Sequence, residues 1–316
     1  MKKIAVLGAG GFIGSHLVTK LKSEGHHVVA VDLKQPEYNI SLADTFLQKD
    51  LRDQLFVKEF FSDTYDEVYQ LAADMGGAGY IFTGEHDADI MYNSAQINMN
   101  IAESLKNSTT KIFYSSSACI YPEENQLDET NPNCAEDSAF PANPDSEYGW
   151  EKLFSERLYL SYARNYGLDV RIARFHNIFG PDGVFAGGKE KAPAAICRKV
   201  AEAVDGDHVE VWGTGNQTRS FLYIEECLEG ISRLMQSEVR EPINIGSAEM
   251  ISINDLTRMV IDISGKNLFI TNIDGPTGVN GRCSDNRLIA NLLNWQPDYP
   301  LQKGMVNLYN WVKFQV

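Results

Sequence analysis

The sequence predicts an α/β fold: a Rossmann-type, doubly wound parallel sheet with a smaller C-terminal α/β lobe. Two observations support this. Short, continuous apolar runs alternate with segments of helical period, as expected for strands that helices bury on both faces. The first apolar run also ends in a glycine-rich turn that opens a helix. With 316 residues, the chain is long enough to form a large core.

The expected elements alternate along the first half of the chain. Strands are predicted at residues 3–7, 28–31, 66–71, 111–115 and 169–175, and helices at 12–23, 88–105 and 148–166. A polar, proline-rich stretch at 122–144 interrupts this alternation and predicts a long surface loop, which we call the flap. Beyond residue 181 the pattern becomes mixed, and the smaller lobe is expected to begin there.

Composition excludes several classes of partner. The formal net charge of −15 opposes binding to nucleic acid and to anionic membranes. Any phosphate site must therefore rest on a few local cations and backbone N–H groups. The five cysteines form no Cys-x-x-Cys pair, so neither a disulfide framework nor a metal site is expected. No window reaches the roughly 18 apolar residues of a membrane span, and we expect a cytoplasmic protein.

The glycine-rich turn Gly8-Ala9-Gly10-Gly11-Phe12-Ile13-Gly14 predicts a dinucleotide site. Glycines allow the backbone to approach a pyrophosphate, which the helix N-terminus attracts. Asp32 ends the next predicted strand, where a carboxylate suits the ribose 2′-hydroxyl of NAD and repels the 2′-phosphate of NADP. The alternative is a packing turn without a cofactor.

Three residues form a candidate redox site. Tyr148 and Lys152 are four residues apart, so on a helix they share one face. With Ser117 from a preceding strand end, they can exchange protons in alcohol/ketone chemistry. Cys119 lies two residues further on. Plain alcohol oxidation does not need this thiol, whereas an enzyme that inverts carbon centres does.

These motifs resemble those of the extended short-chain dehydrogenase/reductase family that acts on nucleotide sugars. Four further segments support the resemblance, which spans almost the whole chain: Leu71-Ala72-Ala73, 174–181, 219–223 and 244–246. Within the family, segments 74–77, 117–123, 187–195 and 281–286 are most similar to redox-neutral epimerases of GDP-hexoses. The chain departs from that pattern at Trp150 and in the flap between Glu124 and Pro144, which could change the sugar accepted.

The resemblance implies NAD as cofactor and assigns residues to it. The implied cofactor residues are Gly8, Gly11, Phe12, Ile13, Gly14, Asp32, Asp50, Leu71, Tyr148 and Lys152. Tyr148 would be the redox acid/base, with its pKa lowered by Lys152 and the nicotinamide charge. Lys152 would also bind the nicotinamide ribose. We expect residues 1–175, rejoined by about 216–245, to form the NAD-binding domain, and 176–215 with 246–316 to form the substrate lobe.

Oxidation at C4 of a hexose would acidify the hydrogens at C3 and C5, and inversion then needs proton carriers on both faces of the ring. The resemblance supplies Cys119 and Lys191 for this task. Alternatively, Cys119 is a small buried hydrophobe, and Lys191 is solvated or only neutralises phosphate. The implied substrate residues are Gly77, Ser117, Asn177, Lys191, Lys199, Arg219 and Arg282. His176 and the other four cysteines are expected to be structural.

Other activities stay open on sequence alone. A GDP-fucose-synthase-like epimerase/reductase would pair its cysteine with a histidine and use NADPH, which Asp32 disfavours. A 4,6-dehydratase would have an acidic pair in place of Ala118-Cys119. A C4 oxidase needs only Ser117, Tyr148 and Lys152, and a non-catalytic NAD sensor would be expected to lose part of that set. The resemblance also implies a homodimer in which the helices at 88–105 and 148–166 of two copies form a four-helix bundle.

Overall fold

A seven-stranded sheet, parallel throughout, forms the centre of the computed structural model, which describes residues 1–316. The strand order is β11-β6-β5-β4-β1-β2-β3. The strands are β1 (Lys3–Leu7), β2 (His27–Asp32), β3 (Thr45–Gln48), β4 (Glu67–Gln70), β5 (Lys111–Ser117), β6 (Asp169–Phe175) and β11 (Ile243–Ile245). The predicted fold class is confirmed.

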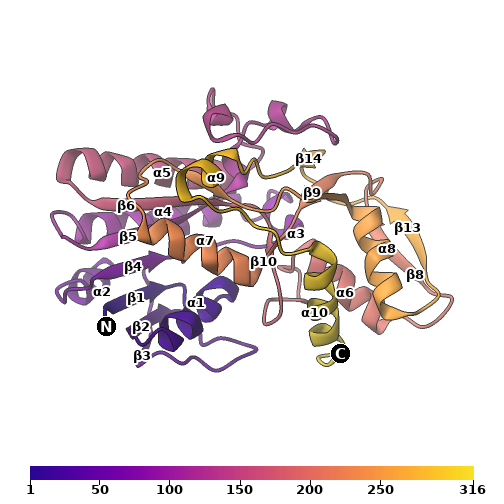
Figure 1. Cartoon of the computed structure of the whole chain (residues 1–316), viewed down its shortest axis with the longest axis horizontal. Helices are drawn as coiled ribbons and strands as arrows, with labels where there is room; N and C mark the ends of the chain where they lie inside the picture. The colour runs from indigo at the N-terminus through magenta and orange to yellow at the C-terminus, as the bar shows by residue number, and fades with distance from the viewer.

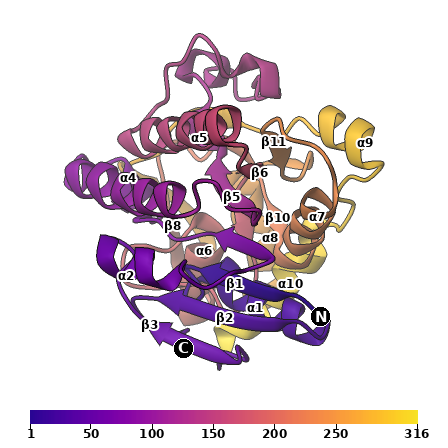
Figure 2. The same ribbon diagram turned by 90° about the vertical axis from the view of Figure 1, so that its left-hand side faces the viewer.

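Helices cover both faces of this sheet (Figure 2). One face carries α1 (Phe12–Ser23) and α7 (Ile224–Gln236), and the other carries α2 (Gln54–Phe60), α4 (Asp87–Ser104) and α5 (Glu147–Tyr166). Strand β1 shows the consequence. Ile4 and Val6 belong to one buried cluster, whereas Ala5 and Leu7 belong to the other. Its apolar run is continuous because alternate side chains enter two different cores.

Local signals account for most boundaries. Helix α5 begins after Ser146, whose Oγ accepts a hydrogen bond from the Gly149 N–H at 3.3 Å, and ends at Gly167 in the left-handed region. The predicted β1 and α1 match the observed bounds. Strand β3 and helix α2 were not predicted. Strand β3 has only four residues and lies half-exposed at the edge of the sheet, so its apolar signal is weak.

A second group of elements lies beside the carboxyl ends of the strands (Figure 1). Its helices are α6 (Ala192–Glu202), α8 (Ile253–Ser264) and α10 (Leu301–Lys313). Its strands are β8 (His208–Trp212), β9 (Thr218–Ser220), β12 (Met250–Ser252), β13 (Phe269–Ile273) and β14 (Gly281–Arg282), paired as β13-β8 and β12-β9-β14. Short strands β7 (Ile178–Phe179) and β10 (Leu222–Tyr223) pair with each other, and helices α3 (Ala78–Ile81) and α9 (Arg287–Leu293) complete the fold. The exact division into a cofactor domain and a substrate lobe stays a prediction.

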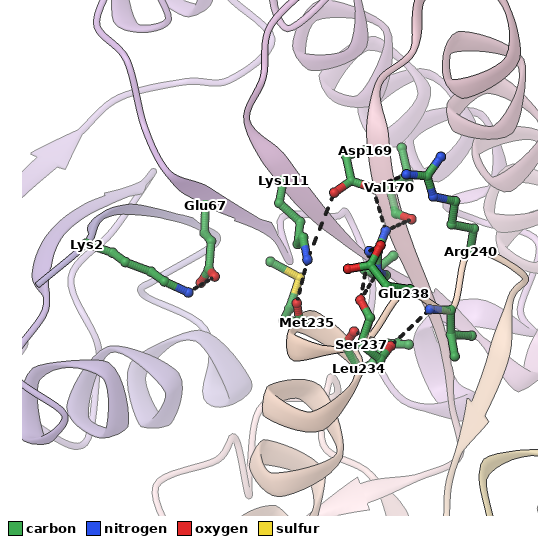
Figure 3. Close-up of polar contacts among 12 residues, drawn as sticks. Lys2, Glu67, Lys111, Asp169, Val170, Leu234, Met235, Ser237, Glu238 and Arg240 are labelled. Carbon is green, nitrogen blue, oxygen red and sulfur yellow. Dashed lines mark hydrogen bonds and ion pairs between the residues drawn. The ribbon is translucent and has the colours of Figure 1, made fainter. Parts of the chain in front are cut away.

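The chain returns to the main sheet through α7 and β11, and cations at the amino edge of the strands contact the end of α7 (Figure 3). Arg171 is fully buried, and its Nε and Nη2 donate to the Ser237 carbonyl at 3.0 and 2.8 Å. Lys111 Nζ donates to the Met235 carbonyl at 3.1 Å. Both carbonyls lie at the C-terminal end of α7, where unpaired carbonyls and the helix dipole favour cations.

The flap contains the two 3₁₀ helices η2 (Glu123–Gln126) and η3 (Glu136–Ala139), and its ends are joined by a bridge between Pro122 and Pro144. Its base is buried, unlike that of an ordinary surface loop, since Gln126 has no exposed surface. The burial arises because β14 passes against the flap, where Asn280 Nδ2 donates to the Leu127 carbonyl at 3.0 Å. None of the helices has the length and apolarity that a membrane span requires.

Candidate active site

Two cavities open at the carboxyl edge of the sheet, the edge at which α/β proteins bind ligands. The larger has a volume of about 590 Å³ and the smaller about 310 Å³. Five residues line both cavities: Met75, Ser117, Tyr148, Phe175 and Lys191. The two cavities therefore meet beside the predicted Ser–Tyr pair.

The glycine-rich turn forms one wall of the larger cavity. Gly8 has φ +82°, and a Cβ there would lie 2.6 Å from the Ala72 nitrogen. A Cβ on Gly14 would overlap the Gly8 carbonyl oxygen. The first turn of α1 carries no acidic side chain, so its N–H groups and dipole face the cavity without a competing carboxylate. This arrangement fits the pyrophosphate of a dinucleotide.

Every predicted cofactor residue lines the larger cavity. It is lined by Gly8, Gly11, Phe12, Ile13, Gly14, Asp32, Asp50, Leu71, Tyr148 and Lys152. The Asp32 carboxylate accepts hydrogen bonds from the Gly10 N–H at 2.9 Å and the Lys34 N–H at 3.1 Å, which fixes its position at the end of β2. Asp50 is held by an ion pair with Arg52 at 2.7 Å.

Ser117, Tyr148 and Lys152 come together where the two cavities meet. Lys152 Nζ donates to the Ser115 carbonyl at 2.9 Å, which ties α5 to β5. A Cβ on Gly149 would overlap the Cys119 carbonyl oxygen, so this glycine lets α5 approach the Cys119 turn closely. Burial raises the pKa of Tyr148 well above its ordinary value, while a hydrogen bond with Ser117 opposes that rise. The sequence predicts a lowered pKa for this phenol. In the protein, burial outweighs the lowering effects, and the pKa is raised instead.

Cys119 and Lys191 both line the smaller cavity. Cys119 lies half-buried on the 3₁₀ turn η1 (Ala118–Ile120), and Arg282 Nη1 donates to its Sγ at 3.1 Å. Lys191 is half-buried just before α6, and its ammonium has no hydrogen-bond partner in the protein. Burial lowers the pKa of Lys191, whereas Cys119 acts in the opposite direction. The interaction indicates that the amine and the thiol are neighbours.

A close contact between two loops sets the position of Lys191. The Gly77 N–H donates to the Lys189 carbonyl at 3.0 Å, and a Cβ on Gly77 would overlap the Glu190 carbonyl oxygen. Gly77 therefore shapes the cavity by permitting this approach.

Positively charged residues line the smaller cavity, although the chain as a whole is strongly acidic. All seven predicted substrate residues line it: Gly77, Ser117, Asn177, Lys191, Lys199, Arg219 and Arg282. Arg198 is a further cation in the lining, which contains only two carboxylates, Glu190 and Glu210. Burial, and then the nearby Arg282, lower the pKa of Arg219 to about 10. Such a cavity suits an anionic ligand.

The predicted structural role of His176 has a clear basis. The ring is fully buried, and its Nε2 lies 3.0 Å from Asn244 Oδ1. Burial lowers the pKa of His176 to about 3, so the ring is neutral at ordinary pH.

Comparison with known proteins places this arrangement in a family. The family model described as "NAD dependent epimerase/dehydratase family" matches residues 4–246. The chain belongs to the NAD dependent epimerase/dehydratase family. The predicted enzyme class and the predicted NAD cofactor are confirmed with it.

Among characterised members, GDP-mannose 3,5-epimerase of Arabidopsis thaliana is 47% identical, over 99% of this chain and 83% of the relative. GDP-mannose 3,5-epimerase 1 of Oryza sativa subsp. japonica is 44% identical, over 99% and 82%. A crystal structure of UDP-glucuronic acid 4-epimerase from Bacillus cereus with UDP-glucuronic acid and NAD matches with a TM-score of 0.83 at 26% identity, covering 99% of this chain and 100% of that one. The resemblance to nucleotide-sugar epimerases is confirmed.

Several residues of this epimerase-family site were not found from the sequence. Gln126 and Asp145 bind Arg282, and Met75 and Phe175 line both cavities. Arg198 is a further cation of the smaller cavity. No local motif marks Gln126 or Asp145, because each lies in or beside the flap, far from Arg282 in the sequence.

Proposed function

We propose that the chain is a redox-neutral epimerase that converts GDP-mannose to GDP-L-galactose by inverting C3 and C5. The observation that carries the proposal is that two further proton carriers, Cys119 and Lys191, line the same cavity as Ser117 and Tyr148. Simple oxidation at C4 would not need them. The names and identities of the plant relatives support GDP-mannose as the substrate. Inversion at C5 alone would give GDP-L-gulose.

The redox half of the reaction uses the site between the two cavities. NAD held by the glycine-rich turn, Asp32 and Lys152 would supply the hydride acceptor for C4 of the hexose and the hydride for its re-reduction. Tyr148 takes the proton of the C4 hydroxyl, and Ser117 holds that hydroxyl through a hydrogen bond. Lys152 Nζ is anchored 2.9 Å from the Ser115 carbonyl and lies 5.7 Å from the centroid of the Tyr148 ring.

The inversion half uses the smaller cavity. A ketone at C4 acidifies the hydrogens at C3 and C5, so a thiolate or a neutral amine can remove them through an enolate. Cys119 and Lys191 act as the two proton carriers, one on each face of the ring. The lowered pKa of Lys191 favours this task, because a neutral lysine can accept a proton. We assign Arg219, Lys199, Asn177 and Gly77 to binding of the nucleotide diphosphate and sugar.

The deciding experiment is incubation with GDP-mannose in D₂O without added reductant. We expect deuterium at C3 and C5 and formation of a GDP-galactose product, because each inversion delivers a solvent-derived proton. Unchanged sugar with deuterium at neither carbon would contradict the proposal. Accumulation of a 4-keto sugar with stoichiometric reduction of NAD would indicate a C4 oxidase instead.

We propose a homodimer formed through α4 and α5. Exposed apolar side chains follow one stripe on each helix: Tyr92 and Met99 on α4, and Trp150 and Phe154 on α5. The helices lie side by side (Figure 2), so two copies can bury these stripes in a four-helix bundle.

Phe154→Glu tests the dimer. A charge in the stripe should shift the chain from dimer to monomer, as light scattering after gel filtration would show. Phe314→Glu, at an exposed apolar residue after α10, is the matched control and should leave the dimer unchanged. A monomeric parent chain would refute the proposal. We also propose that the enzyme works in the cytoplasm, since all five cysteines are unpaired.

A further inference from the structure

Arg282 is held on three sides by side chains from separate segments. Nε donates to Gln126 Oε1, Nη2 donates to Asp145 Oδ2 at 2.9 Å, and Nη1 donates to Cys119 Sγ at 3.1 Å. The guanidinium and the Asp145 carboxylate are only 6% and 5% exposed. Because a guanidinium is planar and rigid, the two oxygen partners determine which nitrogen faces the sulfur.

Several cations lie near Cys119. Lys152 on α5, Lys191 before α6, Arg219 on β9 and Arg282 on β14 each interact electrostatically with this thiol, and the uncharged Tyr148 faces it as well. Asp145 is the carboxylate that interacts with both arginines. Asp145 is thus the counter-charge of Arg282 and Arg219, whereas Glu151 and Glu156 interact with Lys152.

A proton carrier in an epimerase must exist in both protonation states. A neighbouring cation favours the ionised form of a thiol, which can take a proton but cannot deliver one. We propose that Asp145 is the counter-ion that limits the positive charge of Arg282 at Cys119, and that Gln126 fixes the direction of the guanidinium. Asp145 and Gln126 are thus positioning residues that act on Cys119 through Arg282. This inference rests on the proposed role of Cys119 in proton transfer.

Two near-isosteric changes test the charge argument with opposite signs. Asp145→Asn removes the counter-charge, and we expect iodoacetamide to alkylate Cys119 about threefold faster or more at neutral pH. Gln126→Glu adds a negative charge at the same guanidinium, and alkylation should slow by a similar factor. Measurements use the NAD-saturated chain in a Cys283→Ser background, since Cys283 is the other half-buried cysteine. Peptide mass spectrometry follows the modification at Cys119.

A purely structural role would move both variants in the same direction. Alkylation rates of Cys119 that change in the same direction in both variants, or that change in neither, would overturn the proposal. If Asp145→Asn does not fold, Gln126→Glu still decides, because an unchanged or faster rate in that variant contradicts the charge argument. This test needs no substrate, so it stands apart from the identity of the sugar.

Isotope exchange then links the charge to the reaction. In D₂O with GDP-mannose, Asp145→Asn should lose deuterium incorporation at one of C3 and C5 far more than at the other, and Asp145→Glu should restore it. An equal loss at both carbons together with lost C4 oxidation would overturn the positioning role. Absence of exchange in the parent chain would instead refute the proposed function and leave the alkylation result valid.

Discussion

Two cations at opposite edges of the central sheet are held in different ways. At the amino edge, Arg171 donates to the Ser237 and Val170 carbonyls and pairs with Asp169 at 2.7 Å. At the carboxyl edge, the Lys191 ammonium has no protein partner. A cation whose donors are all satisfied holds the fold together. A partly buried cation with free donors is available to a ligand or a proton.

Lys191→Met should have the largest effect and should act on function alone. Loss of a proton carrier typically costs about 10²–10⁴-fold in rate. NAD binding and the folded state should be retained, because a methionine fills the same space without a buried charge. Deuterium exchange, NAD titration and thermal unfolding measure the three properties. Lys34→Met removes an exposed cation that lines the larger cavity, and it is the matched control for the loss of a lysine charge. Equal losses of turnover and NAD affinity would contradict the view that Lys191 serves the reaction and not the fold.

For Arg171→Met we expect the opposite result: the fold is destabilised and turnover is kept. It leaves the carbonyls at the end of α7 without donors and Asp169 without its closest partner, so we expect a loss of about 2–4 kcal/mol in the free energy of unfolding. Turnover of the folded fraction should be unchanged. Urea unfolding measures the effect, and Arg240→Met, at an exposed arginine of the same cluster, should cost well under half as much. Similar losses in both variants would show that the buried arginine has no special role.

The smallest expected effect is on the pH dependence of stability. The pKa of Lys191 is lowered in the folded chain, so the unfolded chain binds more protons between that lowered value and the ordinary lysine value. Stability contributed by this site should therefore rise with pH through that window. Comparing Lys191→Met with the parent at several alkaline pH values isolates the slope, which the variant should lack. An identical slope in both proteins would indicate a solvated lysine.

The carboxyl-edge site was predictable where residues lie close in sequence. The turn from Gly8 to Gly14 and the pair Tyr148 and Lys152 depend on helix period and strand ends, which local spacing encodes. The contact between the flap and Arg282 depends on segments more than 130 residues apart. Nothing in the local pattern at Gln126 or Asp145 indicates that contact.

The sequence by itself determined the parallel sheet and the NAD turn, and it predicted the Ser–Tyr–Lys site, because apolar period, glycine spacing and motif are properties of neighbouring residues. The family resemblance, and not local spacing, supplied Cys119 and Lys191. Only the tertiary structure decided which cations are satisfied and which are free, and that burial raises the pKa of Tyr148. Those properties depend on desolvation and on partners from distant segments, which exist only once the chain has folded.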